Sequence, residues 1–157
     1  MNQPFDYIEM IIPAKPEYVG VVRLTLSGVA SRIGFSYEDL DDLKIAVSEA
    51  CTNAVLHAYK NNGQGEVKIG FGLYQNRIEI MVADDGNSFD FEQARKGIGP
   101  YGHHDSVEFL REGGLGLYLI ETLMDEVRIH HNVGVTVFMT KFLEGERVEI
   151  DAGTIST

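Results

Sequence analysis

The stretch SEACTNAVLHAY, residues 48–59, lies inside the longest helical pattern of the chain. Apolar side chains recur there at the three- and four-residue spacing of one buried helix face. These side chains are Leu40, Leu43, Val47, Ala50, Cys51, Ala54 and Ala58. Ser36 is a suitable N-cap before an acidic first turn, and the pattern ends near Lys60, before Asn61-Asn62-Gly63. The pattern therefore predicts one long helix that packs against a core.

Glu49 and Asn53 lie four residues apart on this helix, so their side chains share a face, away from the centre of the apolar stripe. An amide oxygen can ligate Mg²⁺, which prefers oxygen ligands. A carboxylate can accept a proton from a nucleophile beside a phosphate. The neighbouring Ala46 and Ala50 are small enough to leave room for a ligand. Taken alone, however, the pair fits an amphipathic helix with two solvated polar residues better.

Composition limits the classes of function. A length of 157 residues fits a single domain with a core of its own. A net charge of −11 without any run of Lys or Arg argues against nucleic acid or an anionic membrane as a partner, and suits partners with basic surfaces. The only cysteine, Cys51, is expected to be a buried core thiol. No signal peptide and no apolar run of membrane length is visible, so we expect a cytoplasmic protein.

The rest of the chain predicts an α+β fold. In order, the patterns are a strand at 5–12, a helix from Pro16 to Gly34, the long helix, strands at 66–74 and 77–83, an aperiodic segment at 89–112, a helix at 117–124, and strands at 125–131 and 135–143. This order predicts a two-layer sandwich in which helices cover one face of a mostly antiparallel sheet. Residues 1–143 are expected to form one domain, residues 89–112 a lid, and residues 144–157 a flexible acidic tail.

Two further motifs have the chemistry of nucleotide binding. Asp84 ends a strand, and a carboxylate there can accept a hydrogen bond from an exocyclic amine such as that of adenine, while Gly86 lets the backbone approach the base. The run Gly113-Gly114-Leu115-Gly116 precedes a helix, where unpaired backbone N–H groups favour phosphate. Each motif also has an ordinary explanation, namely an Asp-Gly turn and a loop closed tightly against a helix.

The aperiodic segment contains cations and histidines that are candidate ligands. Arg111 and Lys96 are both able to reach a terminal phosphate. Arg111, beside the glycines, is the better candidate, and Lys96 fits a solvated surface charge. His103 and His104 have no third ligand at zinc spacing. His57 fits a structural or pocket-lining residue.

Taken together and in this order, the three motifs resemble the GHKL superfamily of ATP-binding domains, which includes gyrase-type ATPases, Hsp90, histidine kinases and bacterial anti-sigma serine kinases. Residues 48–59 and the stretch VADDGNSFD, residues 82–90, are most similar to the anti-sigma kinases, and among these to the anti-sigma-B factors of Gram-positive bacteria. The resemblance extends over about residues 5–143. The family often has a glycine at the position of Ser88, and many members have a threonine at the position of Val135.

The resemblance implies roles for the site residues. Glu49 would be the general base that activates a serine hydroxyl of a protein substrate, and Asn53 would hold the Mg²⁺ that bridges the phosphates of ATP. Asp84 would read the adenine amino group, with Gly86 beneath the base. The residues expected at the phosphates are Arg111, Gly114, Leu115 and Gly116. Thr136 is not assigned to the nucleotide.

The resemblance also implies a function. The chain would be an anti-sigma factor and an ATP-dependent protein serine kinase that works as a homodimer. It would sequester a stress-response sigma factor of the sigma-B type and inactivate its anti-anti-sigma protein by phosphorylating one serine. Two alternatives stay open. In the first, the chain is the ATP-binding domain of a histidine-kinase-type protein, although no helical hairpin with an acceptor histidine is visible. In the second, it is a non-catalytic module that binds nucleotide and partners.

Overall fold

The structure, a computed structural model, describes residues 3–60, 65–84, 118–131 and 135–143. The elements are β1 (Asp6–Pro13), the 3-10 turn η1 (Pro16–Tyr18), α1 (Val19–Ile33), α2 (Tyr37–Lys60), β2 (Glu66–Leu73), β3 (Arg77–Asp84), β4 (Glu126–His131) and β5 (Val135–Phe142). Residues 118–123 are also helical. The expected lid and acidic tail lie outside the described residues. No described helix has the length and apolar character needed to span a membrane.

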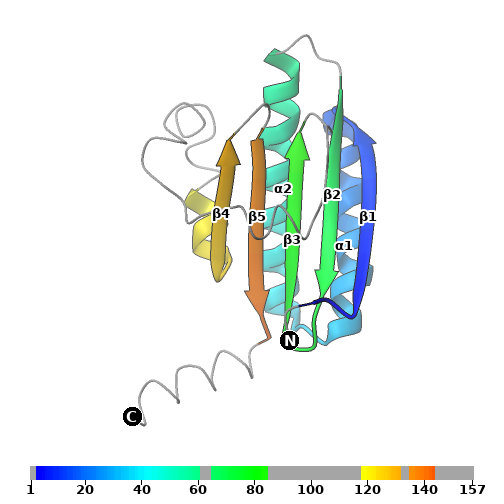
Figure 1. Ribbon diagram of the computed structural model, residues 1–157, viewed down its shortest axis with the longest axis vertical. Coiled ribbons are helices and arrows are strands. Elements are labelled where there is room, and N and C mark those ends of the chain that lie inside the picture. The colour runs from blue at the N-terminus through cyan, green and yellow to red at the C-terminus, as the bar shows by residue number, and fades with distance from the viewer. Residues whose placement is uncertain (1–2, 61–64, 85–117, 132–134, 144–157) are drawn as a thin grey trace.

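The five strands form one sheet in the order β1-β2-β3-β5-β4, and every neighbouring pair is antiparallel. Helix α1 lies behind β1 and β2, and α2 lies behind β3 and β5, so both helices cover the same face (Figure 1). The expected two-layer α+β sandwich is confirmed. It follows from the alternation of apolar and other side chains along β3 and β5, because one face of each strand must be covered.

The core lies between this face of the sheet and the helices. Phe71 on β2, Ile80 on β3 and Met139 on β5 are fully buried and belong to one hydrophobic cluster. Ile120, from the helical residues 118–123, belongs to the same cluster, so that helix packs on the same face as α1 and α2. The hairpin between β2 and β3 closes at residues 75–76, between the two predicted strands, where the Tyr74 N–H donates to the Arg77 carbonyl at 3.0 Å.

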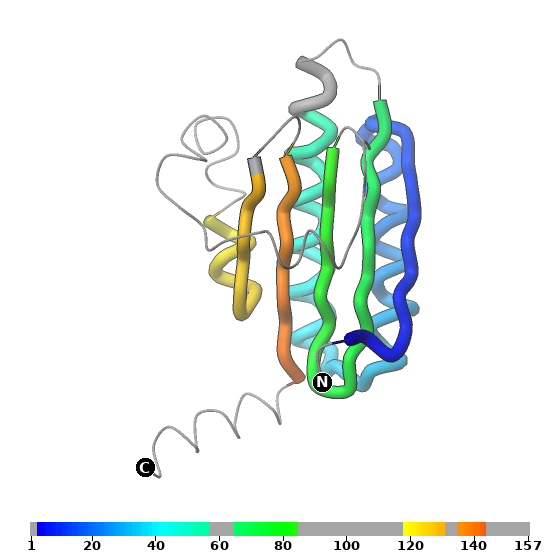
Figure 2. Tube along the Cα trace, in the orientation of Figure 1, coloured from blue at the N-terminus to red at the C-terminus, as the bar shows by residue number. Residues whose placement is uncertain are grey.

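The two long helices begin and end where the sequence predicts. Pro16 opens the first turn, and Gly34 ends α1 in the left-handed region at φ 104°, which glycine adopts without strain. Helix α2 begins at a side-chain cap, because the Ser36 hydroxyl accepts the Asp39 N–H at 3.2 Å. The helix then runs along the full length of the sheet behind β3 and β5 (Figure 2).

Loss of this cap gives a small stability prediction. We expect Ser36→Ala to lower the free energy of unfolding by about 1 kcal/mol, because the Asp39 N–H loses its acceptor in the first turn. Urea unfolding followed by circular dichroism measures the change. Ser27→Ala is the matched control, since the Ser27 hydroxyl lies within α1 and donates only to the Arg23 carbonyl one turn earlier. An equal loss in both variants would contradict the cap assignment.

Cys51 is buried in the core, as expected from its place on the apolar stripe. Burial raises the pKa of its thiol from 9.0 to about 12, because the thiolate is poorly solvated there. The reactive species in alkylation is the thiolate. We therefore expect iodoacetamide at pH 8 to label the folded protein about 10³-fold more slowly than the urea-unfolded chain. Labelling at similar rates in both states, measured by mass spectrometry, would contradict the burial of this thiol.

Candidate functional site

Helix α2 carries two of the expected site residues toward one end of the sheet. It packs against β3 and runs in the same direction, so its C-terminal half lies behind the end of β3 and the start of β5 (Figure 1). Glu49 and Asn53 lie in this half, one helical turn apart. The helix therefore brings both side chains toward the sheet end at which Asp84 closes β3.

Asn53 is buried, with 9% of its surface exposed. Within the described part of the chain, its amide nitrogen Nδ2 has no hydrogen-bond partner. A buried amide nitrogen without an acceptor is costly, and a bound group that pairs with this amide would remove the cost. Rotation of the amide group by half a turn would place Oδ1 where Nδ2 lies, and the oxygen could ligate a hard cation there. The environment of Asn53 thus fits the expected contact with Mg²⁺ and phosphate, and it does not fit a solvated surface amide.

Asp84 lies on the helix-facing side of the sheet. It continues the alternation of Ile80 and Val82, whose side chains belong to the core, and it is 6% exposed. Its Oδ1 accepts the backbone N–H of Val135 at 2.7 Å. The carboxylate therefore joins the end of β3 to the start of β5, in addition to any role toward a ligand. The sequence offers no signal for this contact, because the two residues are far apart in the chain.

Glu49 is half-buried and lies next to a contact between the helices. The Arg23 Nε–H of α1 donates to the Ser48 hydroxyl at 2.9 Å, which ties α1 to α2 beside Glu49.

The expectation that Ala46 and Ala50 leave room for a ligand is wrong. Both are 1% exposed and belong to the hydrophobic core, so they let α2 pack closely on its neighbours.

The remaining expected site residues lie outside the described residues. They are Gly86, Arg111, Gly114, Leu115 and Gly116. Ser88, Lys96, His103 and His104, to which the sequence gives no site role, lie there as well. Thr136, which is not assigned to the nucleotide, alternates with Val135 on β5, so it faces the side of the sheet opposite to the core and is separated from Asp84. The structure thus brings three expected residues, Glu49, Asn53 and Asp84, toward one end of the fold.

These three side chains have complementary chemistry. A buried carboxylate is a strong acceptor for an amine on a flat ring, and a buried amide can hold a cation or a phosphate oxygen. A half-buried carboxylate one turn away can take a proton from an incoming hydroxyl. Such a set suits a phosphoryl donor with an amine-bearing base.

A family model described as the histidine kinase-like ATPase domain matches residues 12–141. The chain belongs to this family. The match includes all three described site residues and every strand and helix from α1 to β4. The GHKL-type ATP-binding fold expected from the sequence is therefore confirmed, and ATP is the nucleotide that this class of domain uses.

Curated members of the histidine kinase-like ATPase family are similar to this chain over nearly their whole length. The serine-protein kinase RsbW of Bacillus velezensis is 63% identical over 149 residues, which cover 95% of this chain and 93% of that protein. The serine-protein kinase RsbW of Bacillus subtilis is 62% identical over 151 residues, which cover 96% and 94%. This likeness confirms the resemblance to the kinase branch of the superfamily that residues 48–59 indicated.

A solved structure with the same fold is the crystal structure of the RsbU and RsbW domains of a Mycobacterium tuberculosis protein. The TM-score is 0.62 at 23% sequence identity, and the match covers 88% of this chain and 33% of that chain. At this identity the match is evidence for the fold of the ATPase domain. The mycobacterial chain is about three times as long as the matched part.

Proposed function

We propose that this chain is an ATP-dependent protein serine kinase and an anti-sigma factor. It transfers the γ-phosphate of ATP to one serine of an anti-anti-sigma protein, and it sequesters a sigma factor of the sigma-B type. The observation that carries the kinase assignment is the identity of 62–63%, over 93–94% of their length, to proteins named serine-protein kinases. The buried amide nitrogen of Asn53, which has no partner among the described residues and lies one turn from Glu49, supports it.

Each described site residue has one task in this proposal. Asp84 accepts a hydrogen bond from the amino group of adenine, and Asn53 holds Mg²⁺ beside the phosphates. The serine oxygen attacks the γ-phosphorus, and the bond from that phosphorus to the bridging oxygen of the β-phosphate breaks. Glu49 accepts the proton of the serine hydroxyl. The magnesium ion, when bound, neutralises charge on the phosphates. Phosphoryl transfer depends mainly on positioning and electrostatics, which is what these groups supply.

Further phosphate contacts are assigned to residues outside the described part of the chain. Backbone N–H groups of a glycine-rich segment before a helix suit phosphate oxygens, and a neighbouring guanidinium adds positive charge. Gly86 is assigned to the space beneath the base. The residues assigned to the phosphates are Arg111, Gly114, Leu115 and Gly116.

The regulatory part of the proposal concerns two protein partners. The unphosphorylated anti-anti-sigma protein competes for the kinase, and its phosphorylated form no longer binds, so the sigma factor stays captive. The net charge of −11 suits partners with basic surfaces. We propose that the kinase acts as a homodimer in the cytoplasm, where the sigma factor would otherwise join RNA polymerase.

A transfer assay tests the function. The full chain is incubated with γ-labelled ATP, Mg²⁺ and each small protein encoded beside it, and the labelled residue is mapped by mass spectrometry. The proposal expects acid-stable label on one serine of one partner, and no label when EDTA removes the metal. Acid-labile phosphate on a histidine would favour the histidine-kinase alternative. Failure to bind ATP at millimolar concentration would favour a non-catalytic interaction module.

A further inference from the structure

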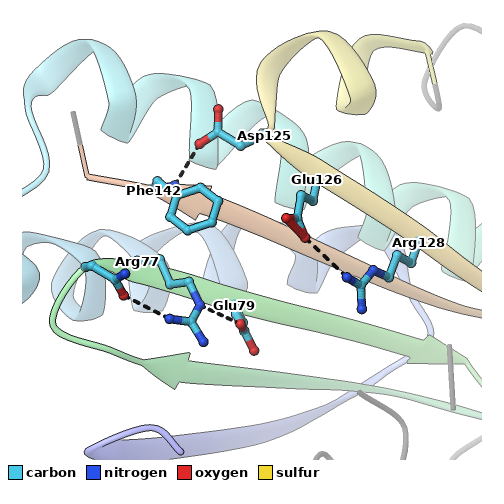
Figure 3. A network of polar contacts seen from close by, with 7 residues as sticks. Arg77, Glu79, Asp125, Glu126, Arg128 and Phe142 are labelled. Atoms are coloured by element: carbon cyan, nitrogen blue, oxygen red, sulfur yellow. Dashed lines mark hydrogen bonds and ion pairs between the residues drawn. The ribbon is translucent and has the colours of Figure 1, made fainter. Parts of the chain in front are cut away.

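The sheet has two edge strands, and their side chains differ. On β4, Arg128 Nη2 pairs with Glu126 Oε1 at 3.4 Å (Figure 3). Charged side chains, above all cations, commonly protect an exposed sheet edge from pairing with another chain. The other edge strand, β1, has eight residues and contains no Lys or Arg (Figure 1). Within the described part of the chain no strand lies beside its outer edge, so β1 is the edge that is open to a further strand.

The hydrogen bonds of β1 show which backbone groups point to this edge. The Ala14 N–H, directly after the strand, donates to the Gly65 carbonyl at 3.0 Å, on the side of β2. Because the hydrogen-bonding groups of a strand alternate between its two sides, the even-numbered residues of β1 bond to β2 and the odd-numbered residues point away from it. Glu9 and Ile11 therefore direct their N–H and C=O groups toward the outer edge.

Apolar side chains are exposed on both faces of β1. Ile8 shares the helix-facing side with the core residue Ile12, yet it is 39% exposed. On the other side, Tyr7 is 38% and Ile11 is 49% exposed. Exposed apolar side chains beside an open strand edge are typical of a surface that another strand covers.

The flank of α1 beside β1 extends this surface. Arg32, near the end of α1, pairs with Asp6 of β1 at 3.8 Å, which shows the side of the helix that lies next to the strand. Val21 and Gly28 lie on the same side, about three turns and about one turn before Arg32. Val21 is 46% exposed, and a side chain added at Gly28 would meet no atom within 4 Å. Apart from the Arg32–Asp6 pair, this flank is uncharged.

We propose that β1 pairs with β1 of a second copy of this chain, antiparallel and about a two-fold axis at Glu9, so that the two sheets join into one. Such an interface is self-complementary, since the Glu9 N–H of each copy donates to the Glu9 carbonyl of the other. Ile8 then lies opposite Met10 of the second copy, and Tyr7 opposite Ile11, so apolar side chains cover apolar side chains on both faces. An axis one residue away would instead set Glu9 opposite Tyr7 or Ile11. The inference rests on the homodimer in the proposed function and gives it an interface, and it is independent of the kinase activity.

This register has one cost that can be measured. The two Glu9 carboxylates lie opposite each other at the axis, on the side of the sheet away from the helices, and like charges in that position repel. Each carboxylate accepts the Tyr7 hydroxyl of its own strand at 2.9 Å. Glu9→Gln keeps an acceptor for this hydroxyl and removes the repulsion. We therefore expect Glu9→Gln to lower the dissociation constant of the dimer about two- to fivefold.

The experiment measures the oligomeric state of the full chain, without nucleotide, by sedimentation equilibrium. The wild-type protein should be a dimer. Ile11→Lys places a cation at the edge, opposite Tyr7 of the second copy, and should raise the dissociation constant of the dimer at least about tenfold. Ile45→Lys is the matched control, because Ile45 is similarly exposed, at 43%, but lies on α2 behind β3 and β5. Its dissociation constant should equal that of the wild-type protein.

Disulfide cross-linking tests the register, and it decides the matter if Ile11→Lys does not fold. In Glu9→Cys the two introduced residues would have Cα atoms about 5.5 Å apart, which suits a disulfide, so oxidation should link the two copies. In Ile11→Cys they would lie about 13 Å apart along the strands, so no link should form. Cys51 is buried, so the wild-type protein should not be linked either.

The outcomes separate the interface from the proposed function. A dimer that Ile11→Lys leaves unchanged and that Glu9→Cys does not link would overturn the interface and leave the homodimer intact. A wild-type protein that is monomeric at about 100 μM would overturn both the interface and the homodimer. Transfer of phosphate to a protein serine tests the kinase assignment separately in either case.

Discussion

Replacement of Glu49 by alanine should lower the rate of phosphate transfer to a protein serine by about 10²- to 10⁴-fold, the usual contribution of a general base. The carboxylate is half-buried, and it lies one helical turn from Asn53. It therefore contributes little to the core, so the fold and the affinity for ATP should stay close to those of the wild-type protein. Single-turnover transfer from labelled ATP measures the rate, and calorimetry measures the affinity.

Two companion variants make this prediction specific. Glu49→Gln keeps the size of the side chain and removes its basicity, so it should lose transfer to a similar extent. Glu38→Gln is the matched control, because Glu38 is an exposed glutamate in the first turn of the same helix. Its transfer rate should equal that of the wild-type protein. Wild-type turnover in Glu49→Ala would refute the assignment of this residue as the base.

Replacement of Asp84 by asparagine should raise the dissociation constant for ATP by about 10- to 100-fold, because a charged hydrogen-bond acceptor contributes about 1.5–3 kcal/mol. The asparagine oxygen can still accept the Val135 N–H, which in the wild-type protein lies 2.7 Å from Asp84 Oδ1. The NH₂ group of asparagine, however, would face the amino group of adenine, and two donors do not pair. The variant should therefore keep its fold and lose much of its preference for ATP over GTP.

Asp84→Ala separates the two roles of this carboxylate. Alanine removes the acceptor for the buried Val135 N–H and, under the proposed function, the acceptor for the amino group of adenine. We expect a similar loss of ATP affinity together with a decrease of about 1–3 kcal/mol in the free energy of unfolding, the cost of a buried donor without a partner. Competition between ATP and GTP measures the preference, and urea unfolding measures the stability. Equal stability of the alanine and asparagine variants would contradict the structural role of the Asp84–Val135 contact.

The elements of this fold were predictable because their signals are local. The Ser36 cap, the stop at Gly34 and the turn at residues 75–76 each depend on a few neighbouring residues. The alternation along β3 likewise predicts that Ile80 and Val82 share one face of the strand, and both belong to the hydrophobic core. Such patterns give the type and the ends of an element, and the order of the elements then leaves few ways to cover the sheet.

The environment of the expected site residues could not be predicted from the sequence. Spacing predicts that Glu49 and Asn53 share one face of α2. It does not show that Asn53 is buried, with an amide nitrogen that no described residue accepts from, because burial depends on what packs over the helix. Pairing over long sequence distance was missed for the same reason. Nothing near Val135 indicates Asp84 as its acceptor, and nothing near Lys141 indicates that its Nζ lies 3.5 Å from the Asp42 carboxylate on α2. Ala46 and Ala50 were misjudged because a small side chain serves close packing as readily as a binding site.

The shielding of Cys51 has a practical consequence for spectroscopy. Since the only native thiol is buried in the core, a cysteine introduced at an exposed position would be the single group that a maleimide dye modifies. Leu56, which is 51% exposed on α2 and lies less than one turn beyond Asn53, is such a position. A fluorophore attached there would sit close to the nucleotide site, so that arrival of ATP or of a protein partner could be followed in real time without replacing any native residue of the core.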